Sequence, residues 1–333
     1  MKVVYSDIHQ HHAPERELTR EGYTPYFECP QRAETILQAL RATPGFQIVP
    51  PSAHPADLLR KIHDPGYLHF LEGIYPAWVK ASEPASGVVP VTFAQGGRRP
   101  ADLVNQTGYY CFDTTPIVGG TYEAALAAAH CAQSAAELLL GGGKAVYALC
   151  RPPGHHAATA LCGGYCYLNN AALAATRLGG RVALLDIDYH HGNGTQEIFY
   201  ASDQVLFLSL HADPDHAYPF FWGFADERGK GKGEGCTRNF PLPAGTADQC
   251  YLETLDQALA LIQSFGPDYL VLSAGFDLLA GDPLGDFAVS LEGLKRIGEK
   301  LAGLRLPTLV VQEGGYNLGK LGGAALALLG PFA

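Results

Sequence analysis

The chain has 333 residues, of which 47% are hydrophobic and 17% charged, so it can bury the core of one large α/β domain or two small ones, and we favour one. The net charge of −10, from 23 basic against 33 acidic residues, argues against a nucleic-acid-binding surface and suits a small cationic substrate. With no stretch near the roughly 20 apolar residues of a membrane helix and eight cysteines without a Cys-x-x-Cys pair, we expect a cytoplasmic protein that is neither exported nor membrane-anchored.

Short apolar runs with strand character alternate along the chain with segments of helical periodicity. The predicted strands are 3–5, 47–49, 145–149, 182–186, 205–210, 269–273 and 308–312. The predicted helices are 31–42, 122–140, 169–178, 248–262 and 291–301. This alternation predicts a single α/β domain over residues 1–333, built on an open, mostly parallel β-sheet with helices on both faces.

Two long segments, 82–121 and 211–246, lack regular periodicity and are rich in glycine, proline and aromatic residues. Loops of that length inside a compact domain usually carry function, and we expect them at the carboxyl ends of the strands. The first segment holds Phe112 and Asp113, and the second holds an aromatic run at 216–222. We predict that the two loops wall a narrow channel. The alternative is that they pack their aromatic rings on the domain surface.

The strand 145–149 breaks at a Pro-Pro-Gly turn, which presents two adjacent histidines, His155 and His156. The strand 182–186 runs directly into a second set of reactive side chains. Residues two apart in an extended strand point the same way, so Asp186, Asp188 and His190 share one face. Asp188 and His190 make a carboxylate–imidazole pair of the kind that binds a borderline divalent cation. The alternative is a polar strand end that caps a helix over 194–200.

A third strand, 269–273, delivers the carboxylate of Asp277. In open α/β proteins, catalytic groups gather at the carboxyl ends of the strands. Aspartate and histidine ligands from such ends, with two further histidines beside them, predict an open-coordination zinc hydrolase site. Water or substrate would occupy its fourth position.

Several ordered motifs resemble those of the zinc-dependent histone deacetylases, which have an arginase/deacetylase-like α/β fold. They are 151–156 (RPPGHH), 164–170 (GYCYLNN), 186–195 (DIDYHHGNGT), 209–211 (SLH), 275–277 (GFD) with 281–283 (GDP), and 313–317 (EGGYN). The match runs through most of the chain. Within that superfamily the N-terminal part is most similar to bacterial acetylpolyamine amidohydrolases, through residues 4–7, His9, Glu17 and 27–34 (FECPQRAE).

The resemblance implies that Asp188, His190 and Asp277 hold Zn²⁺, with Fe²⁺ as an alternative metal, next to a water molecule. His156 is then the general base and acid, and His155 is mainly its electrostatic partner. The metal-ligand spacing read above agrees with this assignment.

The same resemblance implies three supporting residues for catalysis. Asp186 is expected to accept a hydrogen bond from His155, and Asn193 is expected to orient His156. Many relatives have Asp at the position of Asn193, so the basicity of His156 is expected to differ from theirs. Tyr316, which follows a Gly-Gly pair, is expected to donate a hydrogen bond to the substrate carbonyl oxygen.

Two further groups of residues are implied by the resemblance. A structural K⁺ site is expected from Asp186, Asp188, His190, Ser209 and Leu210. Substrate-binding residues, several of them in an aromatic channel wall, are expected to be Glu17, Asp113, Gly164, Tyr165, Tyr218, Phe220 and Leu284. Aromatic walls grip an alkyl chain and attract its ammonium group, while the two acids suit a cationic amine.

The function implied is deacetylation of polyamines such as acetylputrescine, acetylcadaverine or acetylspermidine. Two alternatives stay open: a protein or acyl-lysine deacylase with a wide channel, and a non-catalytic acetyl-amine binder or scaffold. Members of the resembled subgroup are commonly dimers, so we expect a homodimer. Its expected contacts are the aromatic segment 75–78 and the loop beyond Ser82.

Overall fold

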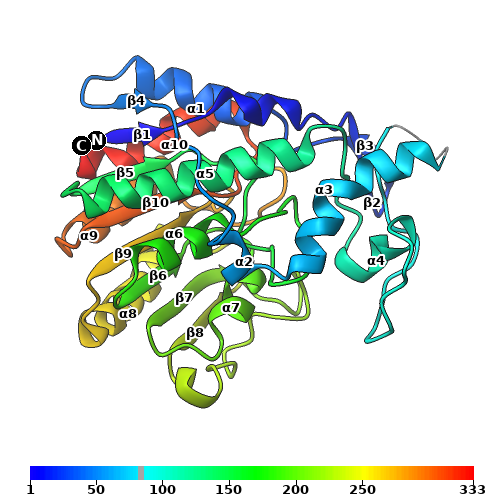
Figure 1. Ribbon diagram of the computed structural model, residues 1–333. Coiled ribbons are helices and arrows are strands. Elements are labelled where there is room, and N and C mark those ends of the chain that lie inside the picture. Colours follow the sequence, from blue (N-terminus) through cyan, green and yellow to red (C-terminus); the bar gives the residue numbers. More distant parts are fainter. Residues whose placement is uncertain (82–85) are drawn as a thin grey trace.

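The computed structural model describes residues 1–81 and 86–333 of the chain. Within these residues, eight strands form one sheet in the order β4-β1-β5-β10-β9-β6-β7-β8, and all neighbouring strands are parallel (Figure 1). Their bounds are β1 Lys2–Val4, β4 Gln47–Val49, β5 Ala145–Ala148, β6 Val182–Asp186, β7 Val205–Ala212, β8 Thr237–Leu242, β9 Tyr269–Ala274 and β10 Thr308–Gln312. A separate antiparallel hairpin pairs β2 (Arg16–Thr19) with β3 (Gly22–Pro25).

Helices cover both faces of the sheet (Figure 1). One face packs against α1 (Gln31–Arg41), α8 (Asp248–Phe265), α9 (Leu291–Ala302) and α10 (Leu318–Leu329). The other packs against α2 (Leu59–Ile62), α3 (Pro65–Lys80), α5 (Thr121–Leu140) and α6 (Asn170–Leu178). The remaining short elements are α4 (Thr107–Tyr110), α7 (Asn193–Phe199), η1 (Asp7–His11), η2 (Val104–Gln106), η3 (Gly231–Gly233) and η4 (Gly330–Phe332).

The strands belong to both hydrophobic cores because successive side chains point to opposite faces of a sheet. Leu184 of β6 packs in the core beneath α5 and α6, and its neighbour Leu185 packs in the core beneath α8 and α9. Both side chains are fully buried. A strand buried on both faces explains why these segments appear as continuous apolar runs rather than as alternating ones.

The α/β class and each predicted strand are confirmed to within two residues at either end, and each predicted helix to within three. The prediction that 211–246 lacks regular structure is wrong, because β7 extends to Ala212 and β8 follows at the sheet edge. Strand β8 contains Pro241, which an edge strand tolerates because one side of its backbone needs no ladder partner. The described part of the first segment, 82–121, contains the short elements η2 and α4 and the first residue of α5, while residues 82–85 lie outside the described part.

Helices α3 and α10 were not predicted either, and their sequences and contacts explain why. Helix α10 carries several glycines, which disfavour helices in isolation. A Cβ atom at Gly322 would lie 2.9 Å from the Ala39 side chain of α1, so glycine permits the close contact of these two helices. Helix α3 contains Pro76 in its interior, and its start is capped by Asp64, which accepts from the backbone of Gly66 and Tyr67.

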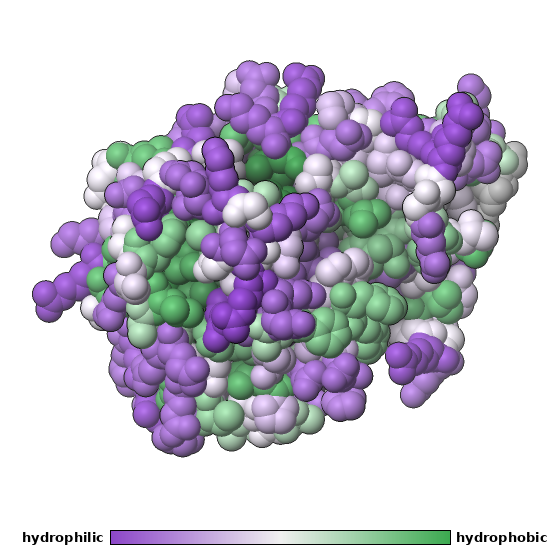
Figure 2. Space-filling model, turned by 90° about the horizontal axis from the view of Figure 1, so that it is seen from below, coloured by the Kyte–Doolittle hydropathy of each residue, from purple (hydrophilic) through white to green (hydrophobic). Residues whose placement is uncertain are grey.

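The surface is mixed in character. Figure 2 shows hydrophilic and apolar residues interspersed over the face seen from below. Among the described residues, the helices are too short or too polar to cross a lipid bilayer.

Candidate active site

The candidate site lies where the loops after β5, β6, β9 and β10 meet. Because these strands are parallel, their carboxyl ends share one edge of the sheet. The loop after β5 carries the tandem histidines, and the loop after β6 carries Asp188 and His190. Asp277 follows β9, and Tyr316 follows β10. Four segments far apart in the sequence therefore supply one site.

Asp188, His190 and Asp277 form a cluster whose ligand atoms all lie within 4.8 Å of one another. His190 Nδ1 lies 3.3 Å from Asp188 Oδ1 and 3.1 Å from Asp277 Oδ2. Tetrahedral ligands that are each ~2.1 Å from a zinc ion are themselves about 3.4 Å apart, so this spacing suits one shared ion. Both carboxylates are fully buried, which is unfavourable without a compensating positive charge.

The electrostatics of this cluster favour a cation. Burial and the charge of Asp188 raise the pKa of Asp277 to about 7. Burial alone would lower the pKa of His190, but hydrogen bonds to Asp188 and Asp277 raise it to about 9. Gly314 N donates to Asp188 Oδ2 at 2.7 Å, and a Cβ atom at Gly314 would lie 2.3 Å from Asp277 Oδ2. Glycine at this position therefore leaves space around the carboxylates, and the donor set fits a divalent metal such as zinc.

The tandem histidines lie beside the cluster, each held by its own partner. His155 Nδ1 donates to Asp186 Oδ2 at 3.0 Å, and His156 Nδ1 donates to Asn193 Oδ1 at 2.7 Å. The two rings are 4.0 Å apart between centroids, and the ring of His156 is 6.1 Å from that of His190. Because His156 donates through Nδ1, its neutral ring keeps Nε2 free to accept a proton.

Different surroundings push the pKa values of the two histidines apart. For His155, burial opposes protonation, but the charges of Asp188 and Asp186 raise its pKa to about 10. For His156, burial and the neighbouring charges of His155 and His190 hold the pKa well below its ordinary value. The charges of Asp188 and Asp186 thus favour the protonated form of His155, whereas the surroundings of His156 favour the neutral form that a general base needs.

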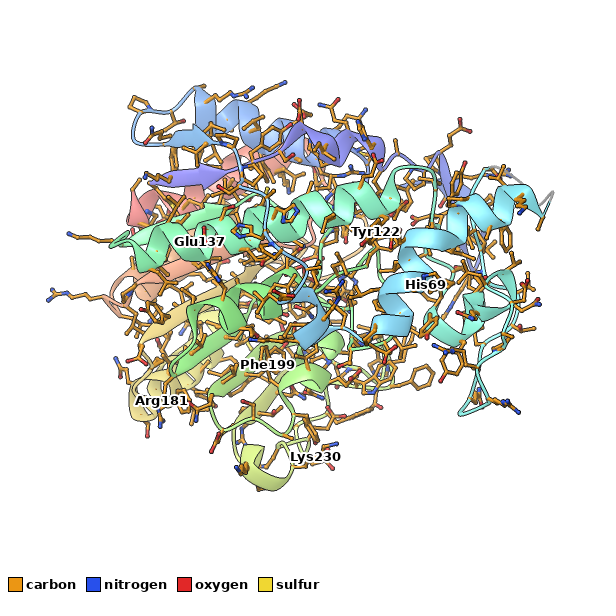
Figure 3. All side chains as sticks on the ribbon, viewed as in Figure 1. His69, Tyr122, Glu137, Arg181, Phe199 and Lys230 are labelled. Atoms are coloured by element: carbon orange, nitrogen blue, oxygen red, sulfur yellow. The ribbon has the colours of Figure 1, made fainter. Side chains whose placement is uncertain are left out.

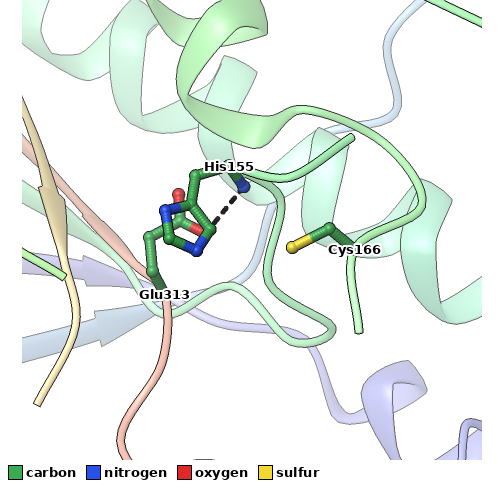
Figure 4. Close-up of side chains that lie close together, drawn as sticks. All are labelled: His155, Cys166 and Glu313. Atoms are coloured by element: carbon green, nitrogen blue, oxygen red, sulfur yellow. Dashed lines mark hydrogen bonds between the residues drawn. The ribbon is translucent and has the colours of Figure 1, made fainter. Parts of the chain in front are cut away.

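Glu313 is a buried residue to which sequence reasoning assigned no role. Its Oε2 accepts from Gly154 N at 2.7 Å and from His155 N at 3.1 Å, while Ser273 Oγ donates to Oε1. Figure 4 shows Glu313 beneath His155, with the Cys166 thiol nearby. Both carboxylate oxygens already accept hydrogen bonds, so Glu313 anchors the tandem-histidine loop, and we do not assign a second metal centre to Glu313, His155 and Cys166.

Tyr316 faces the same site from the loop after β10. Its backbone N donates to Asp282 Oδ2 at 2.7 Å, and its ring packs edge-on against that of Tyr165 at 5.6 Å. Burial holds the pKa of the Tyr316 hydroxyl well above its ordinary value, although the charge of Arg32 opposes this. The hydroxyl therefore keeps its proton and remains a hydrogen-bond donor at neutral pH.

A cavity of about 380 Å³ opens above these groups, a size suited to a small ligand. Its lining includes His156, His190 and Tyr316. The predicted substrate-binding residues that line it are Glu17, Asp113, Gly164, Tyr165, Tyr218 and Leu284. Phe220 was also predicted but lies outside the lining, where its ring stands 6.2 Å from Tyr218 and 5.5 Å from the guanidinium of Arg20.

The two acids in the lining differ in their surroundings. Asp113 is already engaged, because its Oδ2 accepts from Gly164 N at 2.7 Å and from the Tyr218 hydroxyl at 2.8 Å, and its Oδ1 accepts from Thr115 N. Glu17 comes from the hairpin strand β2 and is 7% exposed. Burial raises its pKa to about 7, although a hydrogen bond from Tyr165 lowers it.

Two of the residues predicted for potassium, Asp188 and His190, belong to the metal-ligand cluster, and the other three lie on the neighbouring strands β6 and β7. Asp186 pairs with Ser209 across strands β6 and β7, and both are fully buried. A hydrogen bond of 2.8 Å joins Ser209 Oγ to His211 Nδ1. The structure thus brings Asp186, Ser209 and Leu210 together on two paired strands, and Asp186 also contacts His155.

The chain matches one protein family and several full-length relatives. A family model described as the histone deacetylase domain matches residues 26–330. Acetylpolyamine amidohydrolase 1 of Pseudomonas aeruginosa is 42% identical, with 99% of this chain and 98% of the relative aligned. Acetylpolyamine amidohydrolase of Mycoplana ramosa is 41% identical, with 97% and 96% aligned.

Solved structures agree with the sequence comparison. A crystal structure of acetylpolyamine aminohydrolase from Burkholderia pseudomallei superimposes with a TM-score of 0.96 at 39% identity, covering 100% of this chain and 98% of the other. The HD domain of HDA15 superimposes with a TM-score of 0.80 at 30% identity, covering 99% and 90%. The predicted arginase/deacetylase-like fold is confirmed by this agreement.

Proposed function

Because the chain belongs to the histone deacetylase family, we propose that it is a zinc-dependent amidohydrolase that removes acetyl groups from acetylpolyamines. One observation carries the chemistry: His156, His190 and Tyr316 line one cavity, His190 is clustered with the carboxylates of Asp188 and Asp277, and His155 packs against His156. Such a set supplies each element that hydrolysis of an amide requires, namely a Lewis acid, a general base and an oxyanion donor.

Asp188, His190 and Asp277 would hold the metal. When bound, the metal supplies a Lewis acid that polarises the amide carbonyl and lowers the pKa of a water molecule. His156 accepts the proton of that water at Nε2 and later delivers it to the departing amine nitrogen. His155 lies beside it as the electrostatic partner, and Tyr316 donates a hydrogen bond from its hydroxyl group to the carbonyl oxygen as negative charge develops there.

Support for an acetylpolyamine substrate comes from the relatives and from the cavity. Four curated relatives named acetylpolyamine amidohydrolase are 39% to 42% identical to this chain over nearly its whole length. A free polyamine offers ammonium groups, and Glu17 offers a carboxylate in the cavity wall to pair with one. Asp113 lines the same cavity and accepts hydrogen bonds from Tyr218 and Gly164.

The experiment that tests this proposal compares substrates at equal concentration. We expect zinc-loaded protein to release acetate from N-acetylputrescine, N-acetylcadaverine or N-acetylspermidine with a kcat/KM at least tenfold above that for an acetyl-lysine peptide. A preference for the peptide would favour the protein deacylase instead. Zinc binding without turnover of any acetylated amine would point to a binding protein.

Glu17 leads to a pH-dependent prediction. Its pKa is raised to about 7 by burial, so the group is ionised above that pH and neutral below it. Only the carboxylate attracts an ammonium group strongly. The KM for N-acetylputrescine is therefore expected to rise by up to about tenfold per pH unit as the pH falls below 7. Steady-state kinetics between pH 6 and 8.5 measure it.

Two controls isolate the charge of Glu17. N-butylacetamide has the same amide without the ammonium group, and its KM is expected to show no such rise. In a Glu17→Gln variant the KM for N-acetylputrescine is expected to be high throughout the range. An equal pH dependence of KM for both amides in the native protein would rule out recognition by Glu17.

Other parts of the account stay predictions. We propose that K⁺ binds at Asp186 and Ser209 with backbone oxygens of the neighbouring strand ends, where it would be structural and electrostatic. We also propose a single catalytic domain and a homodimer. The loop beyond Ser82, one of its expected contacts, begins outside the described residues, whereas the segment 75–78 lies in α3.

A further inference from the structure

A fully buried carboxylate, Glu28, lies between two buried arginines close to the candidate active site. Glu28 Oε1 accepts from Arg32 Nη1 at 2.5 Å and lies 2.9 Å from Arg151 Nε. The side chains of all three residues are at most 3% exposed. Two guanidinium groups in so dry an environment need a negative partner, and Glu28 supplies it to both.

Arg32 connects Glu28 to the loop that holds Tyr316. Its Nε donates to the carbonyl oxygen of Gly315 at 2.5 Å, and its Nη2 donates to that of Glu313 at 2.7 Å. Its guanidinium carbon lies 4.7 Å from the centroid of the Tyr316 ring. One planar group thus holds the carbonyl oxygen before the Gly-Gly pair and that of its second glycine, and it also attracts the aromatic ring that follows the pair.

Arg151 links Glu28 to the loop that carries the tandem histidines. It donates through Nη1 to the carbonyl oxygen of His9 at 2.6 Å, and through Nη2 to those of His12 and Glu28 at 2.8 Å and 2.6 Å. The Pro-Pro-Gly turn follows Arg151 directly and leads to His155. Glu28 is therefore the common ion-pair partner of two residues that fix the two catalytic loops.

We propose that Glu28 is a positioning residue for amide hydrolysis, which sets the Tyr316 hydroxyl through Arg32. The inference rests on the proposed function, because it requires that Tyr316 act on the substrate carbonyl. Glu28 lies outside the lining of the cavity, so it acts without touching the substrate. Its carboxylate orients the guanidinium group of Arg32. That group holds the backbone of the Tyr316 loop in position relative to the metal-ligand cluster.

Glu28→Gln tests the proposal because it keeps the shape of the side chain and removes its charge. We expect kcat for N-acetylputrescine to fall by tenfold or more, while KM changes by less than twofold. A displaced donor weakens the transition state and leaves the substrate cavity as it was. In a Tyr316→Phe background the donor is already gone, so Glu28→Gln is expected to lower kcat less than twofold further.

Glu137→Gln is the matched control. Glu137 pairs with Arg177 on the surface of α5, away from the catalytic loops (Figure 3), and its variant is expected to keep the native kcat. Should Glu28→Gln fail to fold, as judged by circular dichroism, Arg32→Lys serves as the second variant. It keeps the charge but cannot hold both carbonyl oxygens, so the same selective loss of kcat is expected.

The outcomes separate the inference from the proposed function. A drop in kcat that is equally large in the native and Tyr316→Phe backgrounds overturns the inference, because Glu28 then acts independently of Tyr316. An unchanged kcat in Glu28→Gln, or in Arg32→Lys where that variant replaces it, does the same. Full activity of Tyr316→Phe alone contradicts the proposed function instead.

Discussion

Replacing Tyr316 by Phe is expected to lower kcat for N-acetylputrescine by about 10²- to 10³-fold. The hydroxyl keeps its proton and belongs to the cavity lining, where the proposed function assigns it to the oxyanion, and loss of one such donor typically costs about 2.7 to 4 kcal/mol in the barrier. The ring contacts with Tyr165 and Arg32 survive the substitution, so the cavity wall persists. Steady-state kinetics on the zinc-loaded variant measure the loss.

KM and the melting temperature separate this effect from unfolding. Both are expected to stay near their native values, because the donor acts mainly in the transition state. Tyr122→Phe, at a half-buried residue of α5 (Figure 3), removes a hydroxyl outside the cavity lining and is expected to be silent. A Tyr316→Phe variant that keeps more than a tenth of the native kcat would remove this residue from the mechanism.

Replacing Asp277 by Asn is expected to abolish hydrolysis and zinc binding together. The substitution removes one of two negative charges that the cluster offers to a metal and leaves a neutral amide of the same shape. Loss of a partner outside the ligand shell already costs 10- to 100-fold in metal affinity, so loss of a ligand is expected to exceed about 100-fold. Metal analysis after gel filtration and kinetics on the same sample measure both quantities.

Asp268→Asn provides a matched comparison for that variant. Asp268 accepts a hydrogen bond from the backbone of Arg181 at the start of β6, at the opposite end of the strand from the site. Its variant is expected to keep native zinc content and activity. Native zinc content in Asp277→Asn would show that the metal binds elsewhere.

The fold could be predicted from the sequence where burial leaves a simple pattern. Strand β6 is buried on both faces and appears as an uninterrupted apolar run, so its bounds were predicted without error. Strand β8 and helix α10 were not predicted, because an edge strand with a proline and a helix with several glycines lack that pattern. Tertiary contacts stabilise both elements: β7 pairs with β8, and α1 packs on Gly322.

The candidate site was likewise predicted only in part. Asp188, His190 and Asp277 were predicted because metal ligands of fixed chemistry follow strand ends, and the structure brings them together. The functions of Glu28 and Arg32 were not predicted. Their partners are each other and backbone carbonyl oxygens more than 280 positions away from Arg32, contacts that no local pattern records.

A crystal structure of zinc-loaded Tyr316→Phe with N-acetylputrescine tests the central claim most directly, because that variant preserves the substrate. We predict one zinc ion between Asp188, His190 and Asp277, with the acetyl carbonyl directed at it and the free ammonium beside Glu17. A metal bound to other residues, or a substrate whose amide lies away from those three side chains, would contradict the account.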